Sequence, residues 1–211
     1  SEITEHLGAI GACLHLFGER ERPLRERVAM GLIQAEVQRA AWLSQGLAVL
    51  TADPAVASDP VDLAVITERV LSALTPEGML AGVGFDFEDR REGRTLVRGD
   101  EQLIALAVAG IVLAVHALVE RVEGARVTLT VSHDVARNTT GLDVGQASIT
   151  LPTAWRAQFF DLSWSDRPGG VRTGAGLSAA HRIAELHGGT LRLEPLPRAG
   201  CCLRLSLPAE R

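Results

Sequence analysis

The stretch RTGAGLSAAHRIAELHGGTLRLEPLPRAGCCLRLSLP, from Arg172 to Pro208, carries its features in an order that few folds require. Its first glycines predict a turn that opens into a helix over 175–186, because glycine has no Cβ to restrict the backbone. The helix is expected to end at His187-Gly188-Gly189, since glycine commonly terminates helices. Two alternating segments follow and predict a hairpin that closes on Leu-Pro. A glycine turn before a helix can bind phosphate groups, because the helix start offers free N–H groups.

The first quarter of the chain predicts a helical hairpin. Residues 24–51 show helical periodicity, and Gly18–Pro23 reads as the turn before them. The segment 1–17 repeats apolar side chains every three or four positions, at Ile3, Leu7, Ile10, Leu14 and Phe17. A lone hairpin cannot bury both apolar stripes, so we expect a second copy to complete a four-helix bundle in a homodimer.

The segment TADPAVASDPVD, with two Asp-Pro steps, predicts a domain boundary. We expect a hairpin domain at 1–52, a linker at 53–60 and a second domain at 61–211. In that domain a helix is predicted at 63–74, followed by strands in MLAGVGFDFED and RTLVRGD on either side of an RREG turn. A long apolar helix from Asp100 to about Val122 and a strand in RVTLTVSHD come next. This irregular mixture predicts an α+β fold with helices on one face of a mixed sheet.

Composition narrows the function classes. The net charge of -5 argues against a nucleic-acid partner, which usually meets a basic face. The apolar run from Leu103 to Val119 is expected to be a buried helix and not a membrane span, and no secretory signal is recognised, so a cytoplasmic location is expected. Cys13, Cys201 and Cys202 are an odd number and two are adjacent, which predicts no disulfide framework. The histidines and cysteines lack metal-ligand spacing, so no metal site is predicted from them.

The order of these features resembles the core of bacterial sensor histidine kinases. That core is a dimerisation and phosphotransfer hairpin followed by a Bergerat-type (GHKL) ATPase domain. TGAGLSAAHRIAELHGG looks like the family's second glycine box with its His-Gly-Gly helix end, and RAGCCLRLSLP is similar to its final strand. The chain is also distantly similar to kinase-like histidine phosphotransferases.

The resemblance implies an ATP site, if one is retained. Asp143 and Gly145 in DVGQA look like the box whose aspartate accepts the adenine amino group, with Ala147 in place of its second glycine. Gly174 and Gly176 would approach the phosphates. AQFFDLSW is similar to the phenylalanine box that anchors the nucleotide lid, and SDRPGGVR would be that lid.

Two parts of the family's catalytic machinery are replaced. The N box would fall on GIVLAV, which puts Gly110 and Ala114 at its two asparagine positions. A methyl group cannot ligate magnesium, which needs oxygen donors, so no ordinary magnesium site is expected. Ser1 stands at the phosphoacceptor histidine position. His6 and His15 lie nearby, but neither is followed by the carboxylate that the family places after its histidine.

We therefore expect a degenerate histidine-kinase-like protein of two-component signalling, without autokinase activity and with no catalytic residue assigned. It would act as a dimeric docking or phosphotransfer-type module for a response regulator or a histidine kinase. One alternative is an active kinase whose histidine lies outside or was altered in this chain, with magnesium held by a displaced ligand such as Glu101 or Gln102. Another is a nucleotide-responsive switch that binds ATP without hydrolysis through Asp143, Gly174 and Gly176.

Overall fold

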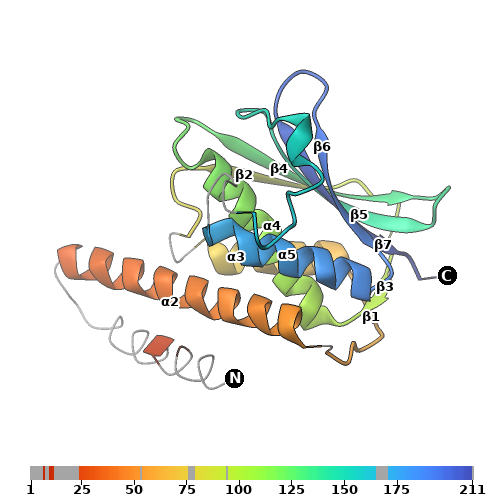
Figure 1. The fold of residues 1–211 in the computed structure, drawn as a ribbon, viewed down its shortest axis with the longest axis horizontal. Helices are drawn as coiled ribbons and strands as arrows, with labels where there is room; N and C mark the ends of the chain where they lie inside the picture. Colours follow the sequence, from red (N-terminus) through yellow and green to blue (C-terminus); the bar gives the residue numbers. More distant parts are fainter. Residues whose placement is uncertain are drawn as a thin grey trace.

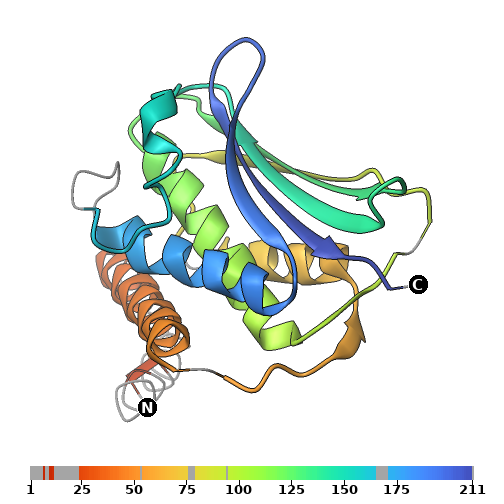
Figure 2. The same ribbon diagram turned by 45° about the vertical axis from the view of Figure 1, so that its right-hand side comes forward.

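The computed structural model describes residues 7, 10–11, 24–52, 54–75, 79–93, 95–164 and 171–210. The elements, in chain order, are α2 (Leu24–Thr51), β1 (Asp59–Val61), α3 (Leu63–Leu74), β2 (Gly84–Asp89), β3 (Val97–Gly99), α4 (Glu101–Val119), β4 (Arg126–Asp134), β5 (Thr139–Gln146), the 3-10 helix η1 (Thr153–Trp155), α5 (Val171–Leu186), β6 (Thr190–Pro195) and β7 (Cys201–Pro208). A sheet forms one layer and α3, α4 and α5 cover one of its faces (Figure 1). Helix α2 lies outside this layer, so that α4 and α5 stand between it and the sheet (Figure 2). The predicted α+β class is confirmed.

The main sheet has five strands in the order β2-β4-β5-β7-β6. Only the β2–β4 pair is parallel, and the other neighbours are antiparallel. Strands β4, β5 and β7 alternate apolar and polar residues, as expected for strands with one covered face. Their buried residues, Val127, Leu129, Val131, Leu142, Val144, Leu203, Leu205 and Leu207, form the floor of the core.

The two strands predicted on either side of RREG are present as β2 and β3, and they belong to different sheets. β2 joins the main sheet, whereas β3 pairs with β1 in a separate two-stranded sheet. The loop between them is held by Arg91, whose side chain is only 4% exposed and lies 2.8 Å from the Asp62 carboxylate at the start of α3. Arg91 also pairs with Asp89 at 2.7 Å and donates to the Thr95 carbonyl. These bonds tie the loop between the two strands to α3.

Helix α4 is the centre of the core. Asp100 caps its start by accepting from the N–H groups of Gln102 and Leu103, and the helix ends at Val119, slightly earlier than expected. By length and composition α4 could cross a membrane, but 67% of its apolar window is buried inside the protein. The helix covers the sheet on one side and contacts α5 and α3 on the other sides.

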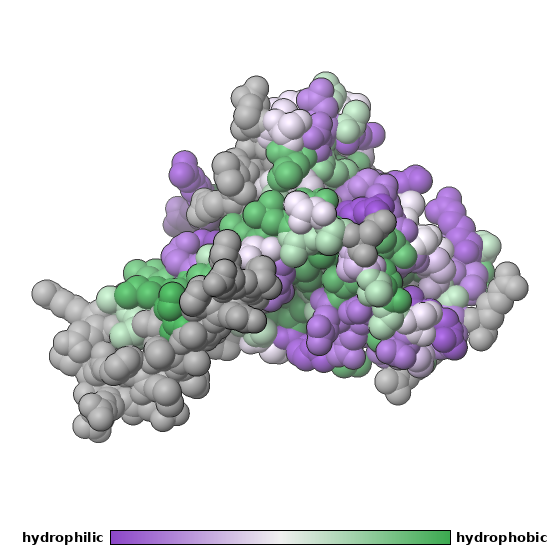
Figure 3. Space-filling model, turned by 60° about the horizontal axis from the view of Figure 1, so that its bottom comes forward, coloured by the Kyte–Doolittle hydropathy of each residue, from purple (hydrophilic) through white to green (hydrophobic). Residues whose placement is uncertain are grey.

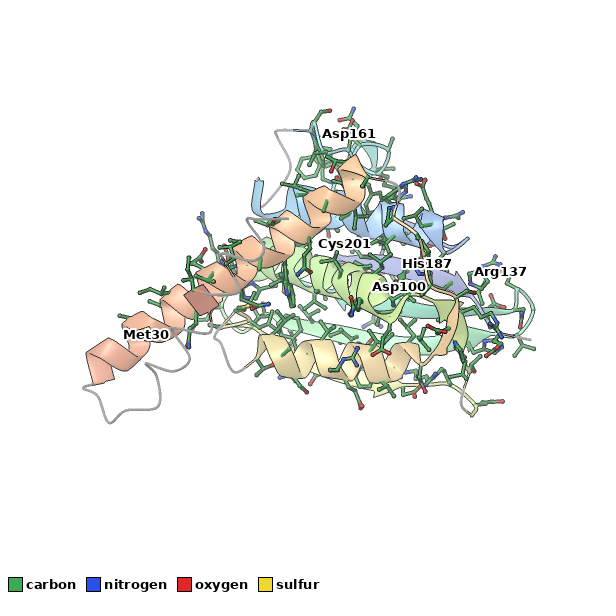
Figure 4. The ribbon with its side chains drawn as sticks, turned by 90° about the horizontal axis from the view of Figure 1, so that it is seen from below. Met30, Asp100, Arg137, Asp161, His187 and Cys201 are labelled. Carbon is green, nitrogen blue, oxygen red and sulfur yellow. The ribbon has the colours of Figure 1, made fainter. Side chains whose placement is uncertain are left out.

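His187 joins the end of α5 to the start of α4. Its Nδ1 lies 2.7 Å from the Ile183 carbonyl, and its Nε2 accepts the Asp100 N–H at 3.0 Å. Because a carbonyl only accepts, Nδ1 carries the hydrogen and the ring is neutral in this arrangement. Gly188 then reverses the chain with a φ of 67°. Figure 4 shows Asp100 and His187 side by side. The His-Gly-Gly motif therefore has a structural explanation in this chain.

The predicted helices 24–51 and 63–74 match α2 and α3. Most of the predicted helix over 1–17 lies outside the described residues, although residues 7, 10 and 11 are helical. The segment 53–60, predicted as a linker, contains the start of β1.

Candidate nucleotide-binding cleft

The two glycines predicted to form a phosphate-binding turn lie within a helix. α5 begins at Val171, so Gly174 and Gly176 occupy its first two turns. Gly176 meets Gly110 of α4, and a Cβ built on Gly110 would lie 2.6 Å from the Gly176 carbonyl oxygen. No real side chain approaches a backbone oxygen so closely, so only glycine fits at Gly110. The prediction of a glycine turn at Gly174 and Gly176 is therefore wrong, because both residues are helical. At this crossing, glycine instead allows the backbones of α4 and α5 to come into contact.

Ala114 lies one helical turn beyond Gly110 and is 1% exposed. Its methyl group offers no electron pair, and magnesium takes oxygen ligands. Within the described part of the chain, no group of three or more His, Cys, Asp or Glu side chains could hold a metal ion. The residues at the cleft therefore do not fit the magnesium ion that the resemblance implies.

The proposed substitutes for a magnesium ligand are distant from this point. Glu101 pairs with Arg69 at 2.5 Å on the surface, and Gln102 is exposed beside it. Nine residues separate Glu101 from Gly110, which corresponds to about 14 Å along an α-helix. Ser1, His6 and His15 lie outside the described residues.

Asp143 and Gly145 are not brought together with the glycines of α5. In β5 the buried residues alternate with Asp143 and Gly145, so these two belong to the outer face of the sheet, away from the helices. The Asp143 carboxylate accepts two hydrogen bonds from Arg204 of β7, at 2.7 and 2.8 Å. This pairing raises the pKa of Arg204 above its usual value. Ala147 is exposed in the loop after β5.

The residue at the inner end of β5 is Gln146, which the sequence analysis did not single out. It is 2% exposed, and its Oε1 accepts from the N–H groups of Ser148 and Ile149, both at 2.8 Å. Its Nε2 donates to the Ile149 carbonyl at 2.6 Å and lies 3.1 Å from the Cys201 sulfur. The side chain thus holds the backbone of the following loop in place, and both the oxygen and the nitrogen of its amide group have hydrogen-bond partners. The alternation of β5 places Gln146 on the inner face, and that signal could have identified it.

The phenylalanine box packs against α5. Phe159 is 1% exposed, and its ring meets Phe160 edge to face at a centroid distance of 5.7 Å. Phe160 stacks on His181 at 4.9 Å, and the Ser178 hydroxyl donates to the Phe160 carbonyl at 2.7 Å. These contacts fasten the segment before the predicted lid. Residues 165–170 of the lid lie outside the described part of the chain.

Helix α2 covers the surface that Gly110 and Gly176 form. A narrow cleft between α2, α4 and α5 is lined by these two glycines and, from α2, by Trp42, Leu43 and Gly46. The cavity that remains is about 30 Å³. This space has room for about one water molecule, but not for a nucleotide.

The cleft has one polar end. Arg39, His116 and Glu120 lie there, and the His116 Nε2 is 3.1 Å from the Ala81 carbonyl. His116 is buried, stacks on Phe85 and lies 3.9 Å from the Glu120 carboxylate. Its contacts account for its place in the helix layer without a ligand.

The comparisons with known proteins agree with this fold. The sequence model of the histidine kinase-, DNA gyrase B-, and HSP90-like ATPase family matches residues 103–211. The solved structure of the mycobacterial sensor histidine kinase MprB superposes with a TM-score of 0.60 at 20% identity, covering 72% of this chain and 98% of that one. No curated protein sequence matches the chain.

Two longer structures also align with α2. Full-length ShkA, solved in complex with AMPPNP, gives a TM-score of 0.67 at 14% identity over 99% of this chain and 44% of its own. The histidine kinase ThkA in complex with the response regulator protein TrrA gives 0.63 at 15% identity over 97% of this chain and 58% of its own. The chain thus spans about half the length of these two proteins. From the family match and the Bergerat-type fold, the chain belongs to the histidine kinase-, DNA gyrase B-, and HSP90-like ATPase family.

Proposed function

We propose that this chain is a degenerate histidine-kinase-like protein of two-component signalling that lacks autokinase activity and works as a dimeric docking or phosphotransfer-type module. One observation carries the proposal: Gly110 and Ala114 offer no oxygen ligand at the cleft, and Gly110 is in backbone contact with Gly176. Phosphoryl transfer depends on positioning and on metal ions that neutralise the phosphates. A domain without that ligand retains the scaffold and loses the chemistry.

Incubation with γ-labelled ATP and magnesium tests this. We expect no label on the protein, because nothing at Ala114 replaces the missing amide. Label that is stable at neutral pH and lost in acid would be a phosphohistidine and would contradict the proposal. The full-length gene product should be tested in parallel, since it would supply any histidine upstream of Ser1 and so also tests the active-kinase alternative.

The dimer is proposed from the exposed side of α2. Leu32, Ile33 and Leu47 are 64%, 49% and 45% exposed. Fourteen residues bring Leu47 back to within about 40° of Ile33, so the three side chains lie on one side of the helix. Figure 3 shows hydrophobic residues gathered over the N-terminal part of α2. An apolar stripe of this kind supports pairing with the same stripe of a second copy.

Light scattering of Leu32→Glu tests the dimer. Two carboxylates placed in a bundle interface would be costly, so we expect the mass to fall from dimer to monomer at micromolar concentration. Val65→Glu on α3 is a matched control, because Val65 is 51% exposed but lies away from the stripe. A monomeric parent protein, or equal masses for both variants, would remove the dimer from the proposal.

The partner we propose is a response regulator or a histidine kinase. Support comes from the aligned ThkA structure, which holds a response regulator, and from the agreement of its kinase fold with 97% of this chain. Co-purification with the response regulators of the same organism, followed by calorimetry of the captured pair, tests it. The Leu32→Glu variant should lose the partner if docking requires the dimer.

A further inference from the structure

The histidines of the ATPase-like domain differ in how open their rings are to a reaction partner. His116 and His187 are buried, at 6% and 9% exposure, and their ring nitrogens lie against backbone groups. The His133 Nδ1 lies 3.4 Å from the hydroxyl of Thr140, a buried residue. The side chain of His181, on α5, is instead 37% exposed, and no residue that the structure describes forms a hydrogen bond with its ring. Its imidazole nitrogens are therefore available for chemistry.

The His181 ring is nevertheless held in a defined place. It stacks on the Phe160 ring, with 4.9 Å between the centroids and 21° between the planes. Phe160 is itself fastened to α5, because the Ser178 hydroxyl donates to its carbonyl, and its ring meets the buried Phe159. Exposed side chains usually move between rotamers, whereas this ring is supported by a second segment of the chain. A supported ring loses less freedom when it is positioned for a reaction.

A carboxylate lies one helical turn after His181, on the same side of α5. One oxygen of Glu185 is 3.8 Å from the His181 Nδ1, and the other is 3.7 Å from the Arg182 guanidinium. The negative charge favours the tautomer that carries its hydrogen on Nδ1, which leaves the lone pair on Nε2. Arg182 partly offsets the charge of the carboxylate, so an approaching phosphoryl group is repelled less strongly. The arrangement thus prepares Nε2 as a nucleophile.

We propose that His181 is a phosphoacceptor, which takes a phosphoryl group on Nε2 from an acyl phosphate. A phosphorylated aspartate of a response regulator belongs to this class of donor. The proposal rests on the proposed function in one respect, that the chain is a phosphotransfer-type module. It places the site on α5 of the ATPase-like domain, and not on the hairpin, where Ser1 stands at the position of the family's histidine.

The transfer is a single displacement at phosphorus. The lone pair of the His181 Nε2 forms the N–P bond while the bond from phosphorus to the acyl oxygen breaks, and the donor carboxylate leaves with that electron pair. The ring is then a phosphorylated imidazolium with its hydrogen on Nδ1, and its positive charge faces the Glu185 carboxylate. Loss of the Nδ1 hydrogen to solvent gives the neutral phosphorylated ring. The step needs neither a nucleotide nor an oxidant.

Incubation of the full chain with radiolabelled acetyl phosphate, a small acyl phosphate, tests the site without ATP. We expect a label that is stable in alkali and lost in acid, and that mass spectrometry assigns to His181. The His181→Gln variant should lose this label. His133→Gln is the matched control in the same domain, and a variant with both His6→Gln and His15→Gln is the control on the hairpin. Both controls should keep the label, and all variants should unfold at the temperature of the parent.

Glu185→Gln tests the positioning role of the carboxylate. The labelling rate should fall about fivefold, the size of effect that one exposed charge exerts at this distance in water. Nitrogen NMR shifts of the His181 ring should show the hydrogen on Nδ1 in the parent and a larger share of it on Nε2 in the variant. The same spectra locate the phosphoryl group, and phosphorylation at Nδ1 would overturn the proposed attack by Nε2.

Two further results would overturn the assignment of His181: no acid-labile label on the parent chain, or a label that persists in His181→Gln. A label on His6 or His15 would remove His181 and leave a phosphotransfer-type module with its site on the hairpin. Acid-labile label from ATP, in contrast, would contradict the missing autokinase activity wherever the label lies. Failure of this assignment and failure of the proposed function are therefore distinguishable.

Discussion

The residues that resemble the family's nucleotide-binding boxes lie in different surroundings on the two sides of the five-stranded sheet. On the outer face, Asp143 and Gly145 lie among polar side chains, and Asp143 pairs with Arg204. On the inner side, in the helical layer, Gly110 and Gly176 are in direct backbone contact beneath α2. Residues that form one site in the resemblance are thus divided between a solvated surface and a packed interior.

This difference shows what each face requires of its residues. On the outer face, an ion pair between cross-strand neighbours is exposed to water. It therefore contributes little to the free energy of unfolding, and substitutions of its members should be tolerated. In the helical layer, a methyl group added at Gly110 would have to displace the backbone of α5 at Gly176. Substitutions in the helical layer should therefore lower the free energy of unfolding much more than substitutions on the outer face of the sheet. The following predictions measure that contrast.

The largest effect is expected for His187→Ala. The change removes the acceptor for the half-buried Asp100 N–H and leaves a cavity beside Gly99, whereas the Ile183 carbonyl still accepts the backbone N–H of residue 187. We expect the free energy of unfolding to fall by about 3 kcal/mol, from one unsatisfied backbone donor and the packing lost with the ring. Urea denaturation measures it. A loss below about 1 kcal/mol would show that the junction between α4 and α5 does not depend on this ring.

A smaller effect is expected for Arg204→Met on the outer face. Arg204 bonds Asp143 at 2.7 Å and Glu194 at 2.9 Å, but its side chain is 45% exposed. The loss of unfolding free energy should therefore be about 1 kcal/mol or less. ATP affinity should not change, because Asp143 lies on the far side of the sheet from the cleft. A change in ATP affinity would show that a group on the outer face recognises adenine, and it would contradict the distinction drawn between the outer face and the helical layer.

The smallest effect concerns Cys202, which lies on the outer face but is 5% exposed. Burial raises the pKa of its thiol from 9.0 to about 12. The unfolded chain then loses this proton first, so the stability contributed by the neutral thiol declines as pH rises from about 9 toward 12. At pH 8 neither Cys201 nor Cys202 should react with iodoacetamide in the native protein, whereas both should react in urea. Rapid native labelling of Cys202 would contradict its burial.

Much of the fold could be predicted from the sequence, because its signals are local. The apolar periodicity of 63–74, the Asp100 cap and the alternation of 126–134 each specify an element without reference to the rest of the chain. The placement of β2 and β3 in different sheets could not be predicted, because β2 pairs with β4 and β3 with β1, partners that are distant in the sequence.

The candidate site was harder to predict, because spacing alone does not reveal which face a residue occupies. Asp143 matches the spacing of the family's box, but the pleat of β5 turns it outward and turns Gln146 inward. Glycine is equally ambiguous. A glycine can form a phosphate-binding turn or allow two helices to cross at close range. Only the position of Gly110 opposite Gly176 in the structure distinguishes these two roles. The cover provided by α2 could not be predicted from the sequence, since it joins α2 to residues of α4 and α5 that lie sixty or more positions later.

The central claim is that glycine at 110 serves helix contact and not phosphate binding, and one pair of unfolding measurements tests it most directly. Gly31→Ala, at an open position of α2, should raise the free energy of unfolding by about 0.5–1 kcal/mol, because alanine favours helix. Gly110→Ala should lower it by about 2 kcal/mol despite the same helix gain, because the added Cβ would lie 2.6 Å from the Gly176 carbonyl oxygen. If Gly110→Ala stabilises the protein as much as Gly31→Ala, the helices do not meet there, and the cleft is open to a ligand.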